Sequence, residues 1–293
     1  MLYYNLKKVD NMVKISRFII CSIVILTLSF VCSCNSKAND VANTIKKNEN
    51  TKEIVEDSIN SIANNTDESL ESGNNSIDNQ GIHLSDDSSD FVLISDIVPD
   101  VILEIRYFST YNFVGERIDG YEEPVAILTK EAANKLKEVS DELLTKGYRL
   151  KIYDAYRPQI AVNHFVNWAK DLDDTKMKKY FYPNLDKDVL FPQGYIAEHS
   201  GHSRGSTIDL TLFDMNLEKE VDMGGTFDYF GEESHPDYKG ITDEQYNNRM
   251  ILRQVMQNHG FKPYTEEWWH FTLIDEPFPN TYFTFPNSKS SIK

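Results

Sequence analysis

The stretch Ser-Gly-His-Ser-Arg-Gly-Ser-Thr-Ile-Asp, at residues 200–209, decides how the folded part of this chain is interpreted. Its second half begins an expected strand at 207–213, in which apolar residues alternate with polar ones. Asp209 belongs to the polar set and points away from the apolar face. Gly205 lets the backbone turn tightly, so that His202 in a loop and Asp209 in a strand can converge on one ion.

A second segment, Glu267-Trp268-Trp269-His270, supplies the groups that the first one lacks. A catalytic zinc ion usually takes three protein ligands from His and carboxylate and keeps one position for water. Glu267 is then the general base for that water. Arg157, expected just beyond a strand at 148–153, is the best candidate to stabilise a developing oxyanion. The expected metal ligands are His202, Asp209 and His270.

The spacing of Glu267 and His270 raises a geometric question, because residues three apart in a regular strand point to opposite faces. Either Glu267 lies in a turn before an aromatic strand at 268–273, or that strand contains a bulge. Each segment taken alone also has a purely structural interpretation, and Arg157 could simply pair with Asp154. The two segments together favour the metal site.

The remaining pattern mixes helices and strands without regular βαβ alternation, which predicts an α+β fold with a mainly antiparallel sheet flanked by helices. Residues 91–293 suit a single domain. The expected elements are extended segments at 91–94 and 101–107, with Tyr107 at a strand end, strands at 148–153, 207–213 and 268–273, helices from Thr129 to Gly147, from Pro158 to Trp168 and at 243–259, a long loop at 214–240, and a short surface tail after Pro277.

The N-terminal residues 1–34 have the pattern of a bacterial lipoprotein signal peptide. Lys14 and Arg17 precede an uncharged run at 18–31, and Cys34 follows a small residue as in a lipidation site. Cleavage without lipidation is the alternative, and Met12 is a second possible start. All three cysteines lie in this segment, so a metal site further along must use His, Asp and Glu.

Residues 35–90 are predicted to form a disordered tether. They contain no Pro and no aromatic residue, and 11 of the 56 are Asn, so they cannot bury enough apolar surface to offset their ordering entropy. They also carry half of the net charge of −16. No basic cluster suggests nucleic acid, and the expected membrane contact is the N-terminal lipid anchor alone.

Four motifs in the same order resemble the VanX-type D-alanyl-D-alanine dipeptidases, which belong with the zinc D-Ala-D-Ala peptidases and the hedgehog-like fold. The resemblance runs through about residues 97–275, nearly all of the folded part. The motifs are Tyr-Asp-Ala-Tyr-Arg-Pro at 153–158, Ser-Gly-His-Ser-Arg-Gly-Ser-Thr-Ile-Asp-Leu-Thr-Leu at 200–212, Met-Gly-Gly-Thr-Phe-Asp at 223–228 and Glu-Trp-Trp-His-Phe at 267–271.

This resemblance implies the same three ligands for one zinc ion, Glu267 as general base and acid, and Arg157 as the group that stabilises the transition state. It further implies that Asp228 pairs with the free amino group of the dipeptide, with Tyr107 alongside, and that Ser200 helps to hold its carboxylate. The substrate implied is D-Ala-D-Ala, hydrolysed to two D-alanines. Gly225 stands where the family pattern has Thr, which affects the loop bearing Asp228.

The chain departs from the resistance-type dipeptidases, which are cytoplasmic, because it carries an export signal and a tether. An exported, lipid-anchored enzyme of the bacterial cell envelope is therefore expected, acting in cell-wall turnover or scavenging. One alternative is a peptidoglycan carboxypeptidase or endopeptidase on the same scaffold. Another is a non-catalytic lipoprotein that binds metal or wall fragments.

Overall fold

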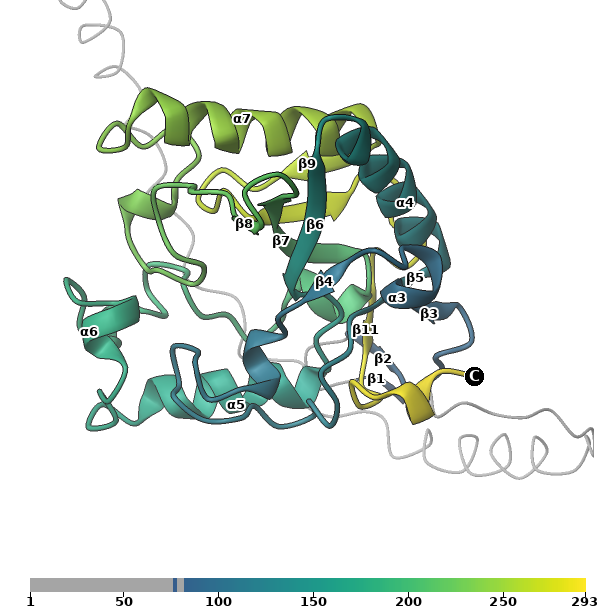
Figure 1. Ribbon diagram of the computed structural model, residues 1–293. Coiled ribbons are helices and arrows are strands. Elements are labelled where there is room, and N and C mark those ends of the chain that lie inside the picture. The colour runs from purple at the N-terminus through teal and green to yellow at the C-terminus, as the bar shows by residue number, and fades with distance from the viewer. Residues whose placement is uncertain (1–75, 78–81) are drawn as a thin grey trace, which may run out of the picture. The chain divides into compact units, whose positions relative to one another are not determined.

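The computed structural model describes residues 76–77 and 82–293 (Figure 1). The strands are β1 Ser76–Ile77, β2 His83–Ser85, β3 Phe91–Leu93, β4 Ile102–Leu103, β5 Ile127–Thr129, β6 Tyr148–Asp154, β7 Thr207–Asp214, β8 Lys219–Glu220, β9 Phe261–Pro263, β10 His270–Leu273 and β11 Thr281–Phe283. The helices are α3 Ile94–Ile97, α4 Lys130–Thr145, α5 Gln159–Lys170, α6 Lys178–Phe181 and α7 Asp243–Asn258. The 3-10 turns are η1 Arg106–Phe108, η2 Lys187–Val189, η3 Gly201–Arg204, η4 Glu232–Ser234 and η5 Lys289–Ser291.

A mainly antiparallel sheet forms the centre of the described part of the chain, with strand order β4-β6-β7-β10-β9 and β8 beside β7. Strands β4 and β6 run parallel, whereas the other pairs of this sheet are antiparallel. The predicted α+β class with a mainly antiparallel sheet is therefore confirmed. The antiparallel register of β7 and β10 sets His270 directly opposite Asp209, so two expected ligands meet across neighbouring strands.

Two long helices form where their end signals and apolar spacing predict them. Helix α4 begins after Thr129, whose side-chain oxygen accepts a hydrogen bond from the amide of Ala132. Helix α7 begins with a capping box between Thr242 and Gln245. In Figure 1 the two helices meet beside the sheet, where α4 covers β6 and α7 covers β9. Helix α5 begins directly after Pro158, as the fixed backbone angle of proline favours.

Three expected strands differ from the observed backbone. The strand at 91–94 ends at Leu93, and Ile94 begins the short helix α3. Tyr107 does not stand at a strand end but in turn η1, where its carbonyl accepts a hydrogen bond from the amide of Ile118. The aromatic strand begins at His270 rather than Trp268, because the Trp268 amide bonds the carbonyl of Ser234 and so leaves the strand ladder.

The C-terminal tail is not the short surface segment that its composition predicts. Strand β11 pairs in parallel with β2, and the Phe283 and Phe285 side chains are buried in a second apolar cluster with Phe91 and Tyr156. Strand β2 lies within the segment assigned to the tether, so strand structure is present before residue 91. Residues 1–34 with Cys34, and most of 35–90, lie outside the described residues.

Within the described residues, no helix combines the length and the apolar character needed to span a bilayer.

Candidate metal centre

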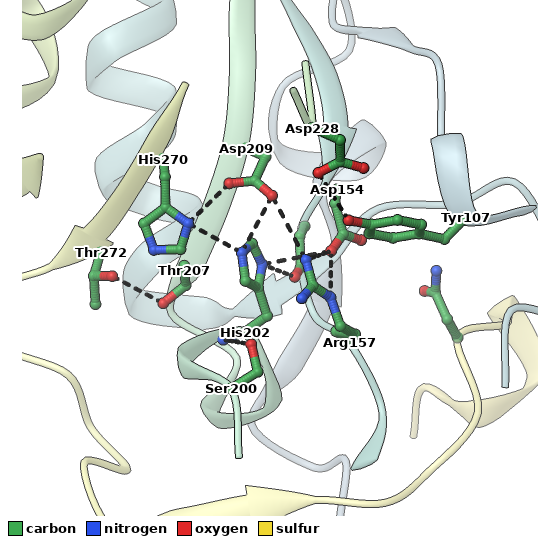
Figure 2. A network of polar contacts seen from close by, with 12 residues as sticks. Tyr107, Asp154, Arg157, Ser200, His202, Thr207, Asp209, Asp228, His270 and Thr272 are labelled. Carbon is green, nitrogen blue, oxygen red and sulfur yellow. Dashed lines mark hydrogen bonds and ion pairs between the residues drawn. The ribbon is translucent and has the colours of Figure 1, made fainter. Parts of the chain in front are cut away.

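Three side chains from separate elements converge at one point beside the central sheet (Figure 2). His202 comes from turn η3, Asp209 from β7, and His270 is the first residue of β10. His202 Nε2 lies 3.2 Å from Asp209 Oδ2 and 3.3 Å from His270 Nδ1, and that Nδ1 lies 3.0 Å from Asp209 Oδ1. The structure thus brings together all three ligands expected from the sequence, within 4.8 Å of one another.

This spacing fits a tetrahedral metal ion. Zinc bound at about 2.0–2.2 Å by nitrogen and oxygen ligands sets those ligands about 3.3–3.6 Å apart. The observed separations of 3.0–3.3 Å reach the lower limit of that range or fall up to about 0.3 Å below it. His202 is also held in the required tautomer, because its Nδ1 lies 2.7 Å from the carbonyl oxygen of Ala155, which can only accept a hydrogen bond. The lone pair of Nε2 therefore faces the other two ligands.

The turn that carries His202 depends on Gly205. This glycine ends η3 in the left-handed conformation, with φ of 79°. A Cβ at this position would stand 2.1 Å from Cε1 of Phe91, so both the backbone angle and the packing require glycine. The turn then leads directly into β7. The tight turn inferred between His202 and Asp209 is therefore present.

The surroundings of His202 and Asp209 favour the protonation states in which these side chains bind a cation. Burial lowers the pKa of His202 in spite of the nearby Asp209, so its imidazole stays neutral. Burial opposes ionisation of Asp209, but the two histidines outweigh it and hold the pKa of this carboxyl well below its usual value. Burial likewise opposes charge on His270, yet Asp209 and then Glu267 raise its pKa. Metal binding would displace the His270 proton.

Glu267 lies in the turn before β10, which answers the question raised by its spacing from His270. Its Oε2 is 3.4 Å from His270 Nδ1, and 35% of its side chain is exposed to the adjoining cavity. Loss of hydration, reinforced by Asp209 and opposed by His270, raises the pKa of this carboxyl to about 7. A carboxylate with that pKa can take up and release a proton near neutral pH.

Arg157 stands just past the end of β6, as predicted, and contacts two carboxylates. Its Nε donates to Asp154 Oδ2 over 3.0 Å, and its Nη2 lies 2.9 Å from the same oxygen and 3.7 Å from Asp209 Oδ2. The guanidinium also stacks over the ring of Tyr107 at 4.9 Å. Pairing with Asp154 therefore does not remove Arg157 from the site. It holds the guanidinium beside the metal ligands.

Asp228 and Tyr107 form a hydrogen-bonded pair near Arg157. Tyr107 Oη donates to Asp228 Oδ1 over 3.1 Å, while Asp228 Oδ2 is buried without a hydrogen-bond partner among the described residues. Asp228 adopts a φ of 61°, which aspartate tolerates better than most residues. Burial, with Asp209 adding to it, raises the pKa of Asp228 well above its usual value. A cationic partner at this oxygen would favour the ionised form and so offset the cost of burial.

The three expected ligands, together with Glu267, Arg157, Tyr107 and Asp228, line one cavity of about 250 Å³, smaller than the pockets that hold drug-sized ligands. Ser200 also lines it, although its Oγ accepts a hydrogen bond from the His202 amide over 3.3 Å. The walls add apolar side chains, among them Phe113, Phe165 and Phe230. The cavity therefore suits a small molecule with charged ends and short apolar side chains.

Two contacts that position residues of the site cannot be recognised from the sequence motifs. Tyr121 donates to Asp154 Oδ1 over 2.5 Å and so fixes the carboxylate that holds Arg157. The Ala155 carbonyl that orients His202 is a backbone group, which side-chain patterns do not report. Tyr121 is far from every motif in the sequence, and only the fold brings it next to Asp154.

A group of three side chains able to hold a metal ion, beside a carboxylate and an arginine on an α+β scaffold, is typical of metallopeptidases. The family model described as D-Ala-D-Ala dipeptidase, peptidase M15, matches residues 87–288. The chain belongs to this family.

Three curated relatives are similar to this chain over most of their own length. A D-alanyl-D-alanine dipeptidase of Enterococcus faecium is 42% identical over 196 residues, which is 67% of this chain and 97% of the relative. One of Streptomyces coelicolor is 37% identical over 199 residues, covering 68% and 98%. One of Escherichia coli is 33% identical over 187 residues, covering 64% and 86%.

Proposed function

We propose that this protein is a zinc-dependent dipeptidase that hydrolyses D-Ala-D-Ala to two D-alanines in the bacterial cell envelope. The observation that carries the proposal is the arrangement of one small cavity. A His-Asp-His group, Glu267 and Asp228 line it together, and one buried carboxylate oxygen of Asp228 has no hydrogen-bond partner among the described residues. The family membership and the names of the curated relatives support the same activity.

His202, Asp209 and His270 would hold one zinc ion per subunit. When bound, zinc supplies a water of lowered pKa and polarises the peptide carbonyl. Such a ligand set would leave one coordination position for water, and Glu267 lines the same cavity as the three ligands. Two neutral imidazoles and one carboxylate would reduce the charge of the ion by one unit and leave it electrophilic.

Glu267 is assigned the proton transfers. It accepts the proton of the attacking water and then donates it to the nitrogen of the leaving D-alanine, so that one carboxyl serves as base and then as acid. A pKa of about 7 suits both directions near neutral pH. Arg157 faces the same space and stabilises the negative charge that develops on the carbonyl oxygen. Asp154 and Tyr121 keep its guanidinium in that position.

The charges at the two ends of the substrate account for the selectivity proposed. The free Oδ2 of Asp228 pairs with the ammonium group of the first D-alanine, with Tyr107 beside it. Ser200 helps to hold the carboxylate of the second. Because the ammonium partner is buried, a longer peptide would have to bury an uncharged amide against Asp228. The site should therefore reject substrates whose amino group is blocked.

The test compares D-Ala-D-Ala with N-acetyl-D-Ala-D-Ala under the same zinc concentration. The proposal predicts that acetylation lowers kcat/KM by about 10–100-fold, the loss expected for one charge-assisted hydrogen bond. Equal cleavage of the two compounds would instead favour a carboxypeptidase or endopeptidase that trims longer peptidoglycan stems. No release of D-alanine from either would leave a non-catalytic binding protein.

The location in the cell envelope rests on the sequence of residues 1–34. Lipidation at Cys34 would anchor the enzyme to a membrane through its N-terminus, with the tether between anchor and domain. In that place the enzyme would act on dipeptides released during cell-wall turnover or scavenging. Metabolic labelling with a fatty acid should mark the parent protein and not Cys34→Ala. Equal labelling of both would contradict the anchor.

A further inference from the structure

Arg204 belongs to the ligand-bearing turn η3 but takes no part in the chemistry proposed above. Its guanidinium forms two parallel hydrogen bonds with the carboxylate of Glu276, from Nε to Oε2 and from Nη2 to Oε1, both over 2.8 Å. The side chains are only 19% and 11% exposed. A bidentate, largely buried pair of this kind fixes geometry more strictly than a surface ion pair does.

The partner segment is the C-terminal part of the chain, beyond the last motif. The amide of Leu273 donates to the carbonyl of Ser206 at the end of β10, and Glu276 follows three residues later. The chain then continues into β11, which lies beside η3, and the Arg204 guanidinium lies 5.9 Å from the ring centre of Tyr282. The turn that carries His202 is therefore held from outside by a segment that contributes no ligand.

The three expected ligands differ in how their backbones are held. Asp209 and His270 face each other across the β7–β10 ladder. His202 lies in a turn of four residues, closed by hydrogen bonds from Ser203 to Ser200 and from Gly205 to His202. A turn of this length has few bonds of its own, so its position depends on contacts from outside, which include the bonds from the Arg157 and Thr129 amides to the carbonyls of His202 and Gly205. An external clamp would therefore affect His202 more than the other two ligands.

We infer that the Arg204–Glu276 pair is a positioning device that holds His202 in register with the other two ligands and so sets the affinity for zinc. The inference rests on the proposed zinc function. It assigns a role to the C-terminal segment, which the metal and substrate motifs leave without one. Once zinc is bound, its effect on water should be the same with or without the pair. Loss of the pair should therefore weaken zinc binding far more than it lowers turnover at saturating zinc.

The experiment measures zinc affinity in the full chain by competition with a chromogenic chelator, for Glu276→Gln and Arg204→Lys. Outer contacts that orient metal ligands typically contribute 10–100-fold to metal affinity. We expect the zinc dissociation constant to rise at least tenfold in Glu276→Gln and by a smaller factor in Arg204→Lys, with kcat at saturating zinc within about threefold of the parent. Arg253→Gln on α7, which breaks a more exposed ion pair to Asp237, is the control and should leave zinc affinity unchanged.

The charge-swapped double variant Arg204→Glu/Glu276→Arg separates positioning from general destabilisation. Recovery of zinc affinity relative to Arg204→Glu alone supports the clamp. A zinc dissociation constant in Glu276→Gln and Arg204→Lys equal to that of the parent overturns it, and so does an equal loss in Arg253→Gln. Zinc binding is read without turnover, so a parent that binds zinc but releases no D-alanine counts against the proposed function and leaves the clamp standing.

Discussion

Replacing Gly205 by alanine tests the turn that joins the first two metal ligands. In the structure this residue has a φ of 79°, and an added Cβ would stand 2.1 Å from Phe91 Cε1 and 3.2 Å from Thr129 Cγ2. The amide of Thr129 also donates to the carbonyl of Gly205, so the turn cannot move away freely. The substitution therefore combines backbone strain with overpacking at one position.

The expected cost follows from these two contributions. The left-handed conformation costs an L-residue about 1–2 kcal/mol, and overpacking a buried site costs about 1–3 kcal/mol. Gly205→Ala should thus lower the free energy of unfolding by about 2–5 kcal/mol. Gly260 offers a matched control, because its φ is 88° but an added Cβ meets nothing within 4 Å. Gly260→Ala should lose only the first contribution, about 1–2 kcal/mol.

Urea unfolding of the zinc-free proteins, followed by tryptophan fluorescence, measures both costs. With a slope of about 1–3 kcal/mol per molar urea, Gly205→Ala should unfold at a urea concentration about 1 M or more below the parent. Equal midpoints for the Gly205 and Gly260 variants would refute the packing argument. A folded Gly205→Ala with parental zinc affinity would refute the link between this turn and His202.

Three further predictions concern the cavity. Arg157→Lys should lower kcat by about 10²–10³-fold with little change in KM, since a compact ammonium cannot hold both Asp154 and the developing oxyanion; a threefold effect or less, by steady-state kinetics, would contradict this role. Asp228→Asn should raise KM for D-Ala-D-Ala by about 10–100-fold, and parental KM would remove Asp228 from substrate binding. Because burial raises the pKa of Asp228, its contribution to stability is complete below the unfolded pKa of about 3.9 and is lost as pH rises. The Asn variant should therefore gain stability over the parent as pH rises from 4 to 8, and a constant difference in urea unfolding would contradict this.

The metal-ligand group could be predicted from the sequence because its signals are local. His202 and Asp209 are seven residues apart on either side of a glycine, and the apolar alternation of β7 fixes which way Asp209 points. The third ligand, His270, needed the second motif, and only the β7–β10 register shows why the two segments meet. The α4, α5 and α7 helices were predictable for the same reason, since their start signals and spacing lie within each segment.

The parts that failed depend on contacts between distant segments. The alternation up to Tyr107 indicates a strand, but the backbone instead turns through η1 and bonds to Ile118. Trp268 has the composition of a strand residue, yet its amide pairs with Ser234 in the long loop. The C-terminal tail is buried because β11 pairs with β2, whose sequence resembles the polar tether before it. No pattern within either segment reports that pairing.

The central claim is that Glu267 transfers the proton at a zinc site formed by His202, Asp209 and His270. Zinc content and D-alanine release from D-Ala-D-Ala, measured on the same samples of the parent and Glu267→Ala, test it most directly. The account predicts that Glu267→Ala retains about one zinc ion per chain while kcat falls by about 10²–10⁴-fold. Equal rates of D-alanine release from the two proteins would contradict it.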